Sequence, residues 1–410
     1  MCFNFNYSMT SDAAIAKSVD KFSNSFYEQL LKSNEHVNLI CSPLSVQICA
    51  SMLRMGAIDG SATAKQLDNG LKLSSRLLVE IANNFNDLVA YYEQYSVLQM
   101  ASKLYLHQDY ELSKSFQDLL ASKYRSPAEL IDFENAEAAA SSINSWVQQK
   151  TNNCIKQLIS AAALGADTTL LLVNAIHFKA NWRIQFDKLE TSKEYFQLDA
   201  AGNKRLVKMM HATNYFEYAL LKSLKAKALR LRYTNCALSM LIILPDQAAG
   251  LHNLQRKLAS TSLENITKQL RKLRIDVKLP KFKAEFEQEL SPIFQQLHMQ
   301  RLFNAPEFKL MIEQQTRIDV SKIIHKAYIE VNEQGSEAAA ATAAVLMTRS
   351  LPQAPSPPPE PEIFHADRPF YFTIYDDKYG RLFVGNLKLP AEASNLPACE
   401  CGQDVCECEN

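Results

Sequence analysis

The sequence predicts a single α+β domain, and three observations support this. The first part of the chain, between residues 13 and 151, is rich in predicted helices, and residues 13–31 carry apolar residues at helical spacing. Several later runs, between residues 168 and 387, have the composition of strands. No change in composition divides residues 13–390 into separate units. Helices that come first and strands that come later are typical of an α+β fold.

The first part of the chain is predicted to be helical. Apolar residues on one helix face predict a helix over residues 13–31. The members of this face are Ile15, Val19, Phe22, Phe26 and Leu30. Pro43 suits the first turn of the next helix, since a proline there removes no helical hydrogen bond, and this helix is expected to run toward Met55. Further helices are expected at residues 61–67, 75–92 and 136–151.

Strands are predicted in the middle and at the C-terminal end. Residues 168–179 form a nearly unbroken apolar run, which is typical of a strand that is buried on both faces. Residues 237–244 have a similar composition, and residues 323–331 alternate between apolar and polar side chains. Residues 370–375 and 382–387 are also predicted to be strands.

The overall composition excludes several functional classes. The 410 residues include 44 basic and 44 acidic side chains, so the chain is neutral, which argues against nucleic acid and membrane surfaces as partners. A hydrophobic content of 47% suits a globular protein. No segment has the run of about 18 apolar residues that a transmembrane helix needs. The N-terminus lacks the pattern of a signal peptide, which favours a cytoplasmic protein; secretion is the alternative.

Eight of the nine cysteines fall into two groups. Four stand mostly among apolar neighbours and are predicted to be buried free thiols: Cys41, Cys49, Cys154 and Cys236. Four others crowd the tail, residues 391–410: Cys399, Cys401, Cys406 and Cys408. Such Cys-x-Cys repeats can bind soft metals or form disulfides, but a disordered acidic tail with exposed thiols is equally consistent, so no metal site is assigned.

The stretch from Glu333 to Ser350 has an unusual composition. After an acidic turn it contains small uncharged residues and ends at a single arginine, Arg349. In an extended chain every second side chain shares one face, and here one face is entirely uncharged. Its members are Ser336, Ala338, Ala340, Thr342, Ala344 and Leu346, while Glu337, Ala339, Ala341, Ala343 and Val345 form the other face. Such a strand could enter a sheet without burying a charge on that face.

Local propensity leaves a helix open as the alternative for this stretch. Alanine is the best helix former, and Ser336 could cap a helix. The following residues, Leu351-Pro-Gln-Ala-Pro-Ser-Pro-Pro-Pro-Glu-Pro, favour an extended and exposed chain because proline fixes the backbone. The alanine-rich run therefore leads into a surface loop.

Ordered motifs along residues 13–390 resemble those of the serpin family. They include Ser42-Pro-Leu-Ser, Ile143-Asn-Ser-Trp-Val, Leu172-Val-Asn-Ala-Ile-His-Phe-Lys-Ala-Asn-Trp, Val207-Lys-Met-Met, Glu333-Gln-Gly-Ser-Glu-Ala-Ala-Ala-Ala-Thr and Phe364-His-Ala-Asp-Arg-Pro-Phe-Tyr-Phe. Each motif alone is weak, but their order is specific. The resemblance implies a single domain with three β-sheets, about nine helices and an exposed reactive loop at about residues 333–363.

The resemblance also implies a function as a serine protease inhibitor rather than an enzyme. In this family a protease cleaves the loop and forms an acyl-enzyme, and the loop then inserts into the main sheet and traps the protease covalently. Serpins are themselves an established example of strand insertion and of the release of stored strain. No cofactor is expected, and a monomer is expected. The alternative is a non-inhibitory serpin that acts as a carrier, chaperone or storage protein.

Counting along the family pattern from Glu333 assigns the cleaved bond to Arg349–Ser350. An arginine there suits a trypsin-like protease, which has a carboxylate at the base of its specificity pocket. Cleavage after Met347 or Thr348 is the alternative. The expected partner is therefore an arginine-specific serine protease.

The resemblance assigns three further groups of residues. The hinge and insertable strand comprise Glu333, Gly335, Ser336, Glu337, Ala338, Ala339, Ala340, Ala341 and Thr342. The shutter, a hydrogen-bonded set where the main sheet opens, comprises Ser42, Ser45, Asn174 and His325. The insertion point comprises Trp182, Lys281 and Glu333, with an expected Glu333–Lys281 ion pair. The absence of a Gly-x-Ser-x-Gly motif argues against a hydrolase built on these serines and the histidine.

Clusters of basic residues are few along the chain. Residues 75–92 contain Arg76 but no basic stripe, so activation by a glycosaminoglycan is not expected. Lys268, Arg271, Lys272 and Arg274 form a local basic cluster, which is interpreted as a solvated face.

Overall fold

The computed structural model describes residues 5–73, 82–83, 86–87, 90–92, 97–314, 316–336 and 360–390, with side chains from residue 15 onward. Its α-helices are α1 (Phe5–Ser33), α2 (Pro43–Gly56), α3 (Ala62–Gly70), α5 (Lys114–Tyr124), α6 (Ala136–Lys150), α7 (Leu251–Leu258), α8 (Leu263–Thr267) and α9 (Ser291–Gln296). Short 3-10 helices are η1 (Ala161–Ala163), η2 (Lys188–Glu190), η3 (Lys222–Leu224), η4 (Ala248–Gly250) and η5 (Gln300–Phe303).

The strands are spread along the chain after α1. They are β1 (Leu39–Cys41), β2 (Leu98–His107), β3 (Glu129–Ile131), β4 (Leu170–Phe178), β5 (Ala180–Asn181), β6 (Ser192–Gln197), β7 (Lys204–Leu221), β8 (Ala226–Arg232), β9 (Leu238–Pro245), β10 (Arg271–Pro280), β11 (Phe282–Glu289), β12 (Val320–Val331), β13 (Gly335–Ser336), β14 (Glu362–His365), β15 (Phe370–Asp376) and β16 (Gly380–Leu387).

The predicted α+β fold is observed, and most predicted elements are present. The predicted helices at residues 13–31, 61–67 and 136–151 correspond to α1, α3 and α6, and the predicted strands correspond to β4, β9, β12, β15 and β16. The helix predicted at residues 75–92 lies largely outside the described residues. Ser42 caps α2 as expected, because its hydroxyl accepts from the Ser45 amide and Pro43 occupies the first turn.

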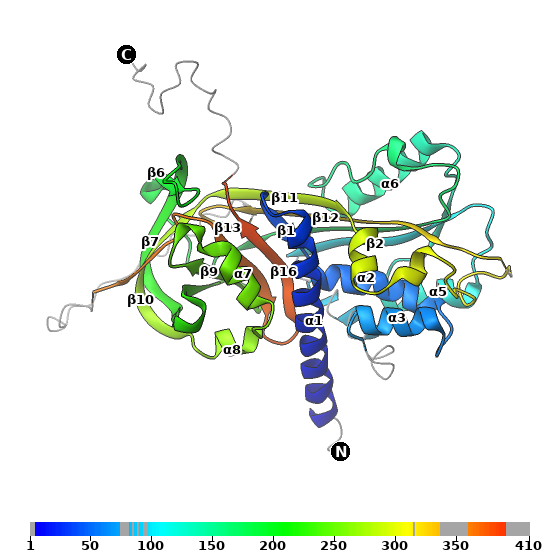
Figure 1. Ribbon diagram of the computed structural model, residues 1–410, viewed down its shortest axis with the longest axis horizontal. Helices are drawn as coiled ribbons and strands as arrows, with labels where there is room; N and C mark the ends of the chain where they lie inside the picture. Colours follow the sequence, from blue (N-terminus) through cyan, green and yellow to red (C-terminus); the bar gives the residue numbers. More distant parts are fainter. Residues whose placement is uncertain are drawn as a thin grey trace, which may run out of the picture.

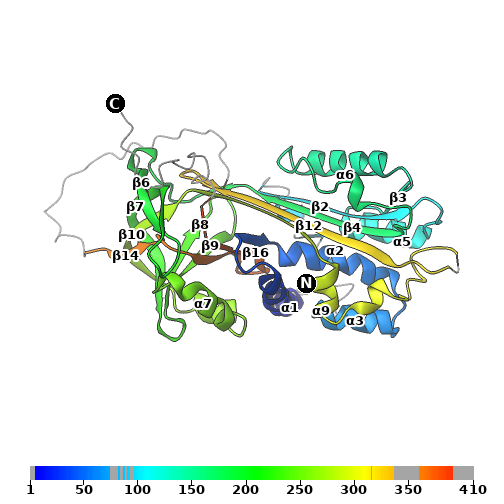
Figure 2. The same cartoon turned by 45° about the horizontal axis from the view of Figure 1, so that its top comes forward.

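The main sheet contains the strand order β3-β2-β4-β12-β13-β5, and β11 pairs with the outer edge of β12. Figure 2 shows α6 above β2, β4 and β12, and α2 below them. This sandwich explains why every residue of β4 is buried. Leu171, Val173 and Ala175 face a small core under α6, whereas Leu172 and Ile176 face the main core.

The other strands form one continuous hydrogen-bonded set with the order β1-β16-β15-β9-β8-β7-β10-β14, and β6 pairs with β7. The 18-residue strand β7 joins two parts of this set. Its first residues pair with β6, its middle with β10, and its last residues with β8. The expected three-sheet arrangement is therefore observed with two of its sheets joined through β7. Figure 1 shows β6, β7 and β10 at one end of the molecule, β1 and β16 near its middle beside α1, and α3, α5 and α6 at the other end.

Candidate functional site

The β4–β12 seam, the line along which these two strands meet, runs through the middle of the main sheet. The strands pair directly and in parallel from Leu170/Val320 to Phe178/Ile329. No strand lies between them along this stretch of described residues. Adjacent strands in a sheet lie about 4.8 Å apart, so no further strand fits between paired β4 and β12. A strand could enter only if β4 and β12 separated.

The seam is open at one end, where β13 lies between β12 and β5. Ser336 pairs with Val331 on one side and with Ala180 on the other, and both pairings are antiparallel. Gly335 pairs with Asn181. The predicted hinge therefore enters the sheet at the end of the seam, and the described chain stops at Ser336.

Gly335 is required by a close approach of two backbones. A Cβ atom at this position would lie 2.1 Å from the carbonyl oxygen of Ala180 and 2.5 Å from the Cα of Asn181. Its φ of +156° is also rarely adopted by L residues. Ser336 next to it is fully buried, and its hydroxyl lies 2.8 Å from the Tyr233 hydroxyl. A small residue is therefore needed at each of these two positions.

The residues of the predicted insertion point surround β13. The Trp182 indole N–H donates to the Asn332 carbonyl at 2.9 Å, and the Trp182 amide donates to the Gln334 carbonyl at 2.7 Å. Its ring stacks on Tyr233 with a centroid distance of 4.4 Å and an interplanar angle of 16°. These contacts hold the turn between β12 and β13 against the residue that follows β5.

The expected Glu333–Lys281 ion pair is present. Lys281 Nζ lies 3.0 Å from one Glu333 carboxylate oxygen, and the Thr191 hydroxyl donates to the other at 2.9 Å. Burial works against ionisation of Glu333, but backbone hydrogen bonding together with Lys281 and Thr191 keeps its pKa below the ordinary value. The carboxylate thus stays charged and ties the hinge to the junction of β10 and β11 and to the chain just before β6.

The four residues of the predicted shutter meet in the middle of the seam. His325 on β12 lies 2.6 Å from the Asn174 side-chain oxygen on β4, and the Ser42 amide donates to the other ring nitrogen at 3.2 Å. Asn174 also donates to the Ser45 hydroxyl at 2.7 Å. These bonds join both strands of the seam to the start of α2.

The hydrogen bonds determine the protonation state of His325. Its Nε2 accepts from a backbone amide, so its Nδ1 carries the proton and donates to Asn174. Full burial lowers the pKa of His325 from 6.5 to about 3, so the ring is neutral near pH 7. Nε2 is therefore not available to activate a serine hydroxyl. The Ser42 hydroxyl itself donates to the Leu382 carbonyl at 2.5 Å.

Sequence reasoning missed three polar residues of this region. Ser102 on β2 accepts a second hydrogen bond from Asn174 at 2.8 Å, Thr191 binds Glu333, and Tyr233 contacts both Trp182 and Ser336. None of them belongs to a motif or a periodic pattern. Their positions depend on strand register and on contacts between distant parts of the chain.

A family model described as "Serpin (serine protease inhibitor)" matches residues 17–390. The chain belongs to the serpin family. Human Serpin B4 is 33% identical over 406 residues, which cover 92% of this chain and all of that protein. Serine protease inhibitor 42Dd of Drosophila melanogaster is 34% identical over 360 residues, covering 86% of this chain and 92% of that protein. The solved structure "Cleaved Serpin 42Da" has a TM-score of 0.81 and 38% identity, covering 93% of this chain and 99% of that one.

Membership in the serpin family has functional consequences at a general level. Serpins as a group are serine protease inhibitors, so the protein is not an enzyme and its partners are serine proteases. Ovalbumin, in its uncleaved form, shares the fold with a TM-score of 0.78 at 23% identity. That similarity concerns the fold alone.

Several predicted site residues lie outside the described part of the serpin chain. These are Arg349 and Ser350 of the predicted cleaved bond, Glu337 to Thr342 of the insertable strand, and the tail cysteines Cys399, Cys401, Cys406 and Cys408. Their assignments stay predictions. Within the described ranges, no group of three or more His, Cys, Asp or Glu side chains could hold a metal ion. No helix in the described ranges is long and apolar enough to span a membrane.

The prediction of four buried thiols was correct for two of them. Cys41 and Cys49 are buried free thiols, and burial raises the pKa of Cys49 to about 12. Cys154 and Cys236 are also thiols outside any disulfide, but they are only half-buried, so the prediction of burial was wrong for them. Both lie in turns, after α6 and between β8 and β9, where the chain runs along the surface.

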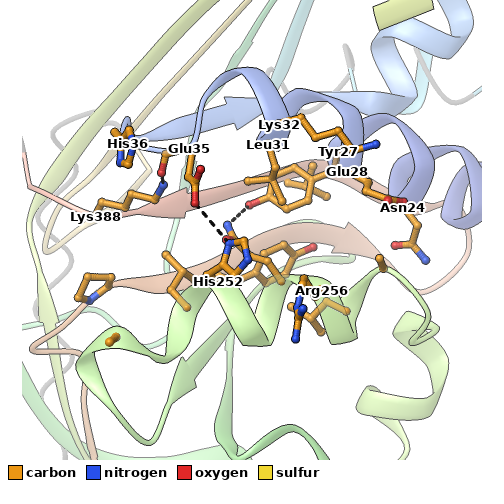
Figure 3. Close-up of a pocket in the computed structure, with 18 of the residues that line it drawn as sticks. Asn24, Tyr27, Glu28, Leu31, Lys32, Glu35, His36, His252, Arg256 and Lys388 are labelled. Carbon is orange, nitrogen blue, oxygen red and sulfur yellow. Dashed lines mark hydrogen bonds and ion pairs between the residues drawn. The ribbon is translucent and has the colours of Figure 1, made fainter. Parts of the chain in front are cut away.

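A cavity of about 750 Å³ lies between α1 and α7, away from the seam (Figure 3). Leu31, Leu251 and Val384 contribute apolar surface to it, and Glu35 and His252 face each other across its rim at 3.7 Å. Inside, Gln255 donates to the Tyr27 hydroxyl at 3.0 Å. The buried Ser23 hydroxyl, which also lines the cavity, has no hydrogen-bond partner among the described residues.

Proposed function

We propose that this serpin inhibits a trypsin-like serine protease by insertion of its cleaved loop. The protease would cut the Arg349–Ser350 bond. Its catalytic serine would form an ester with the Arg349 carbonyl, which is the acyl-enzyme, and Ser350 would become a new N-terminus. The segment that begins at Ser336 would then enter the main sheet between β4 and β12. The attached protease would travel with it along the sheet.

The observation that carries this proposal is that the β4–β12 seam is closed along most of its length and open at one end. The strands meet directly along most of their length, while β13 already lies in the opening at one end. An inserting strand would continue in the antiparallel direction that Ser336 has with both neighbours. Each hydrogen bond lost between β4 and β12 would be replaced by bonds to the new strand on both sides, so insertion adds backbone hydrogen bonds to the sheet.

The sequence beyond Ser336 supports the same proposal. One face of the run from Ser336 to Leu346 is small and uncharged, so a strand made from it could be buried on that face. The polar bonds of His325 and Asn174 cross the seam and would have to rearrange as it opens. We infer that this cluster controls how readily the two strands separate.

Specificity for arginine follows from the assignment of the cleaved bond. Mass spectrometry of the C-terminal fragment released by trypsin should give a peptide that begins at Ser350. A fragment that begins at another residue would refute this assignment, and cleavage after Met347 or Thr348 is the specific alternative.

A disulfide across the seam tests insertion directly. His177 and Tyr328 are register partners on β4 and β12, and their rings lie 5.6 Å apart. The double variant His177→Cys/Tyr328→Cys should form a bridge, since paired strands bring Cα atoms within the range that a disulfide spans. With the bridge closed, trypsin should cleave the loop without forming a denaturant-resistant complex. Reduction should restore the complex.

The controls are the two single variants, His177→Cys and Tyr328→Cys. Each removes one ring but cannot form the bridge, so each should trap trypsin under both oxidising and reducing conditions. Trapping by the oxidised double variant at the yield of the single variants would refute insertion between β4 and β12.

The cavity between α1 and α7 supports a second candidate function as a carrier of small molecules. An apolar wall with charged groups at the rim and an unpartnered buried hydroxyl suits a small amphipathic ligand. Anilinonaphthalene sulfonate is a suitable fluorescent probe. Stoichiometric binding that is abolished by Leu31→Trp, with unchanged protease trapping, would support this function. The absence of any such binding would refute it for ligands of this type.

A further inference from the structure

Two histidines meet one carboxylate on the partly exposed face of β7, β10 and β14. Asp276 on β10 lies between His211 on β7 and His365 on β14. One Asp276 carboxylate oxygen lies 2.5 Å from His211 Nε2, and the other lies 2.9 Å from His365 Nε2. The Thr213 hydroxyl donates to the first oxygen at 3.2 Å. A single carboxylate therefore joins β10 to the strand on each side of it.

The strand β14 is short and lies at the edge of its sheet. Its four residues pair in parallel with β10, and no strand pairs with its other edge among the described residues. Figure 2 shows β14 beside β10 at the end of the molecule that also carries β6 and β7. The fully buried Phe364 anchors one face of β14. On the other face Ile363 is 53% exposed, so the His365–Asp276 bond is a substantial part of the attachment there.

The strand β14 also fixes one end of the chain segment that precedes it. The described chain stops at Ser336 in β13 and resumes at Glu360, two residues before β14 begins. The segment between these points is therefore held by β13 at its start and by β14 at its end. How firmly β14 pairs with β10 determines how much chain is free on the C-terminal side of that segment.

The surroundings of His211 suit a protonated ring. Its Nε2 faces Asp276, and its Nδ1 lies 3.5 Å from a carboxylate oxygen of Glu190 in η2. A neutral imidazole can donate from only one nitrogen, whereas a protonated imidazole donates from both. The protonated ring of His211 therefore has a negative group beside each of its nitrogens.

The neighbouring elements carry charges of both signs. The charged side chains around the cluster are Glu190 in η2, Glu194 on β6, Lys227 on β8, Arg274 and Lys278 on β10, and Glu362 on β14. Glu194 offsets the charge of Lys278, which it binds at 2.7 Å, and it also interacts electrostatically with His365. Lys227 donates to the Ile363 carbonyl at 3.1 Å.

Asp276 stays ionised throughout the range in which histidines titrate. Burial works against its ionisation, but hydrogen bonds from His365 and His211 keep its pKa below the ordinary value. Histidine ordinarily changes its charge between about pH 5 and about pH 8. Within this range, the charge of the cluster therefore depends on its two imidazoles.

We propose that His211, Asp276 and His365 form a pH-sensitive latch that holds β14 on β10 more firmly in mildly acidic than in mildly alkaline solution. When both rings are protonated, each bond to Asp276 joins opposite charges, and such bonds are roughly twice as strong as neutral ones. As pH rises the rings lose these protons, and the bonds persist in a weaker, neutral form. The latch does not depend on the proposed inhibition.

Hydrogen exchange of the β14 amides tests the latch in the full chain, without a protease. Mass spectrometry follows peptides that cover residues 362–365 between about pH 6 and about pH 8. Each rate is divided by that of the same peptide in the unfolded chain at the same pH. The test variants are His211→Gln, His365→Gln and their combination, because glutamine can donate to Asp276 but cannot become charged. The matched control is His252→Gln on α7, where the histidine also lies beside a carboxylate, 3.7 Å from Glu35.

In the wild-type chain and the control, corrected exchange at β14 should be about fivefold faster near pH 8 than near pH 6, and high salt should reduce this difference. Each single variant should show a smaller difference, and the double variant should show none. Exchange in β15 should not follow this pattern in any of the chains. Equal pH dependence in the wild-type chain and the double variant would overturn the latch. A wild-type chain without pH dependence at β14, or with the same dependence at β15, would overturn it as well.

Discussion

The backbone contact at Gly335 makes this residue the most sensitive position of the hinge. In Gly335→Ala the new methyl group would meet backbone atoms of Ala180 and Asn181 that cannot move independently of β5. We expect β13 to leave its place between β12 and β5, with loss of the Ser336–Tyr233 contact and a lower melting temperature. Trp182 emission reports the change in a Trp146→Phe background, since the sequence contains only two tryptophans.

A second glycine distinguishes the steric clash at position 335 from the strain of a positive φ. Gly202 also has a positive φ, at +90°, but no atom lies within 4 Å of the position of its missing Cβ. Strain alone costs on the order of 1–3 kcal/mol, so Gly202→Ala should lower stability modestly and leave Trp182 emission unchanged. Equal effects of the two substitutions would contradict the importance of the contact.

His325 should make the protein sensitive to acid. Its folded-state pKa of about 3 lies below the ordinary value of 6.5, so below that value the unfolded chain binds a proton that the folded chain does not. The contribution of His325 to the free energy of unfolding is therefore fully present above pH 6.5 and is lost as pH falls toward 3. The loss reaches up to about 1.4 kcal/mol per pH unit.

Denaturant midpoints measured between about pH 7 and about pH 4 test this dependence. The slope of unfolding free energy against pH gives the number of protons taken up on unfolding. His325→Gln should lower this number by close to one in the acid range, whatever its effect on stability at neutral pH. Ser142→Ala is the control, since it replaces an exposed side chain without a titratable group, and it should leave the slope unchanged. A slope that His325→Gln does not alter would show that other groups cause the acid sensitivity.

At the scale of elements, Asn144 attaches α6 to the segment that follows it. Its side-chain oxygen accepts from the amides of Leu158 and Ile159 at 2.8 and 3.0 Å, and its amide donates to the Ile159 carbonyl at 2.8 Å. Leu158 and Ile159 belong to the small core between α6 and the main sheet. The cover over β4 and β12 thus depends on one polar side chain as well as on apolar packing.

Asn144→Ala would leave these backbone groups without a partner, at a cost of about 1–3 kcal/mol. We expect a lower denaturant midpoint and faster hydrogen exchange at Leu158 and Ile159. Ser142→Ala, on the exposed side of the same helix, should change neither. Unchanged exchange in Asn144→Ala would indicate that apolar contacts alone hold this segment.

At the scale of the whole molecule, the proposed insertion predicts a change in thermal stability on cleavage. A strand added between β4 and β12 would bury further apolar surface and would pair both edges of the seam. Cleavage by trypsin should therefore raise the melting temperature toward the hyperstable range above about 90 °C. The oxidised His177→Cys/Tyr328→Cys variant should show no such rise after the same cleavage, and a rise in it would contradict the mechanism.

Local sequence patterns were sufficient for many individual elements. Helical spacing predicted α1, and continuous apolar runs predicted β4 and β9. Each of these signals lies within a short stretch of consecutive residues, so it can be recognised without knowledge of the tertiary structure. The long strand β7 was not predicted as a strand. It depends on pairing with three separate partners, β6, β10 and β8.

The sequence by itself determined the α+β class, the serpin family and the identity of the residues that meet at the shutter and the insertion point. Only the tertiary structure decided that β4 and β12 meet directly, that β13 already lies at the end of their seam, and that Ser102, Thr191 and Tyr233 join these clusters. The physical reason is that a sequence pattern records local periodicity and composition. Strand order, register and hydrogen-bond partners arise from contacts between residues that are far apart in the chain.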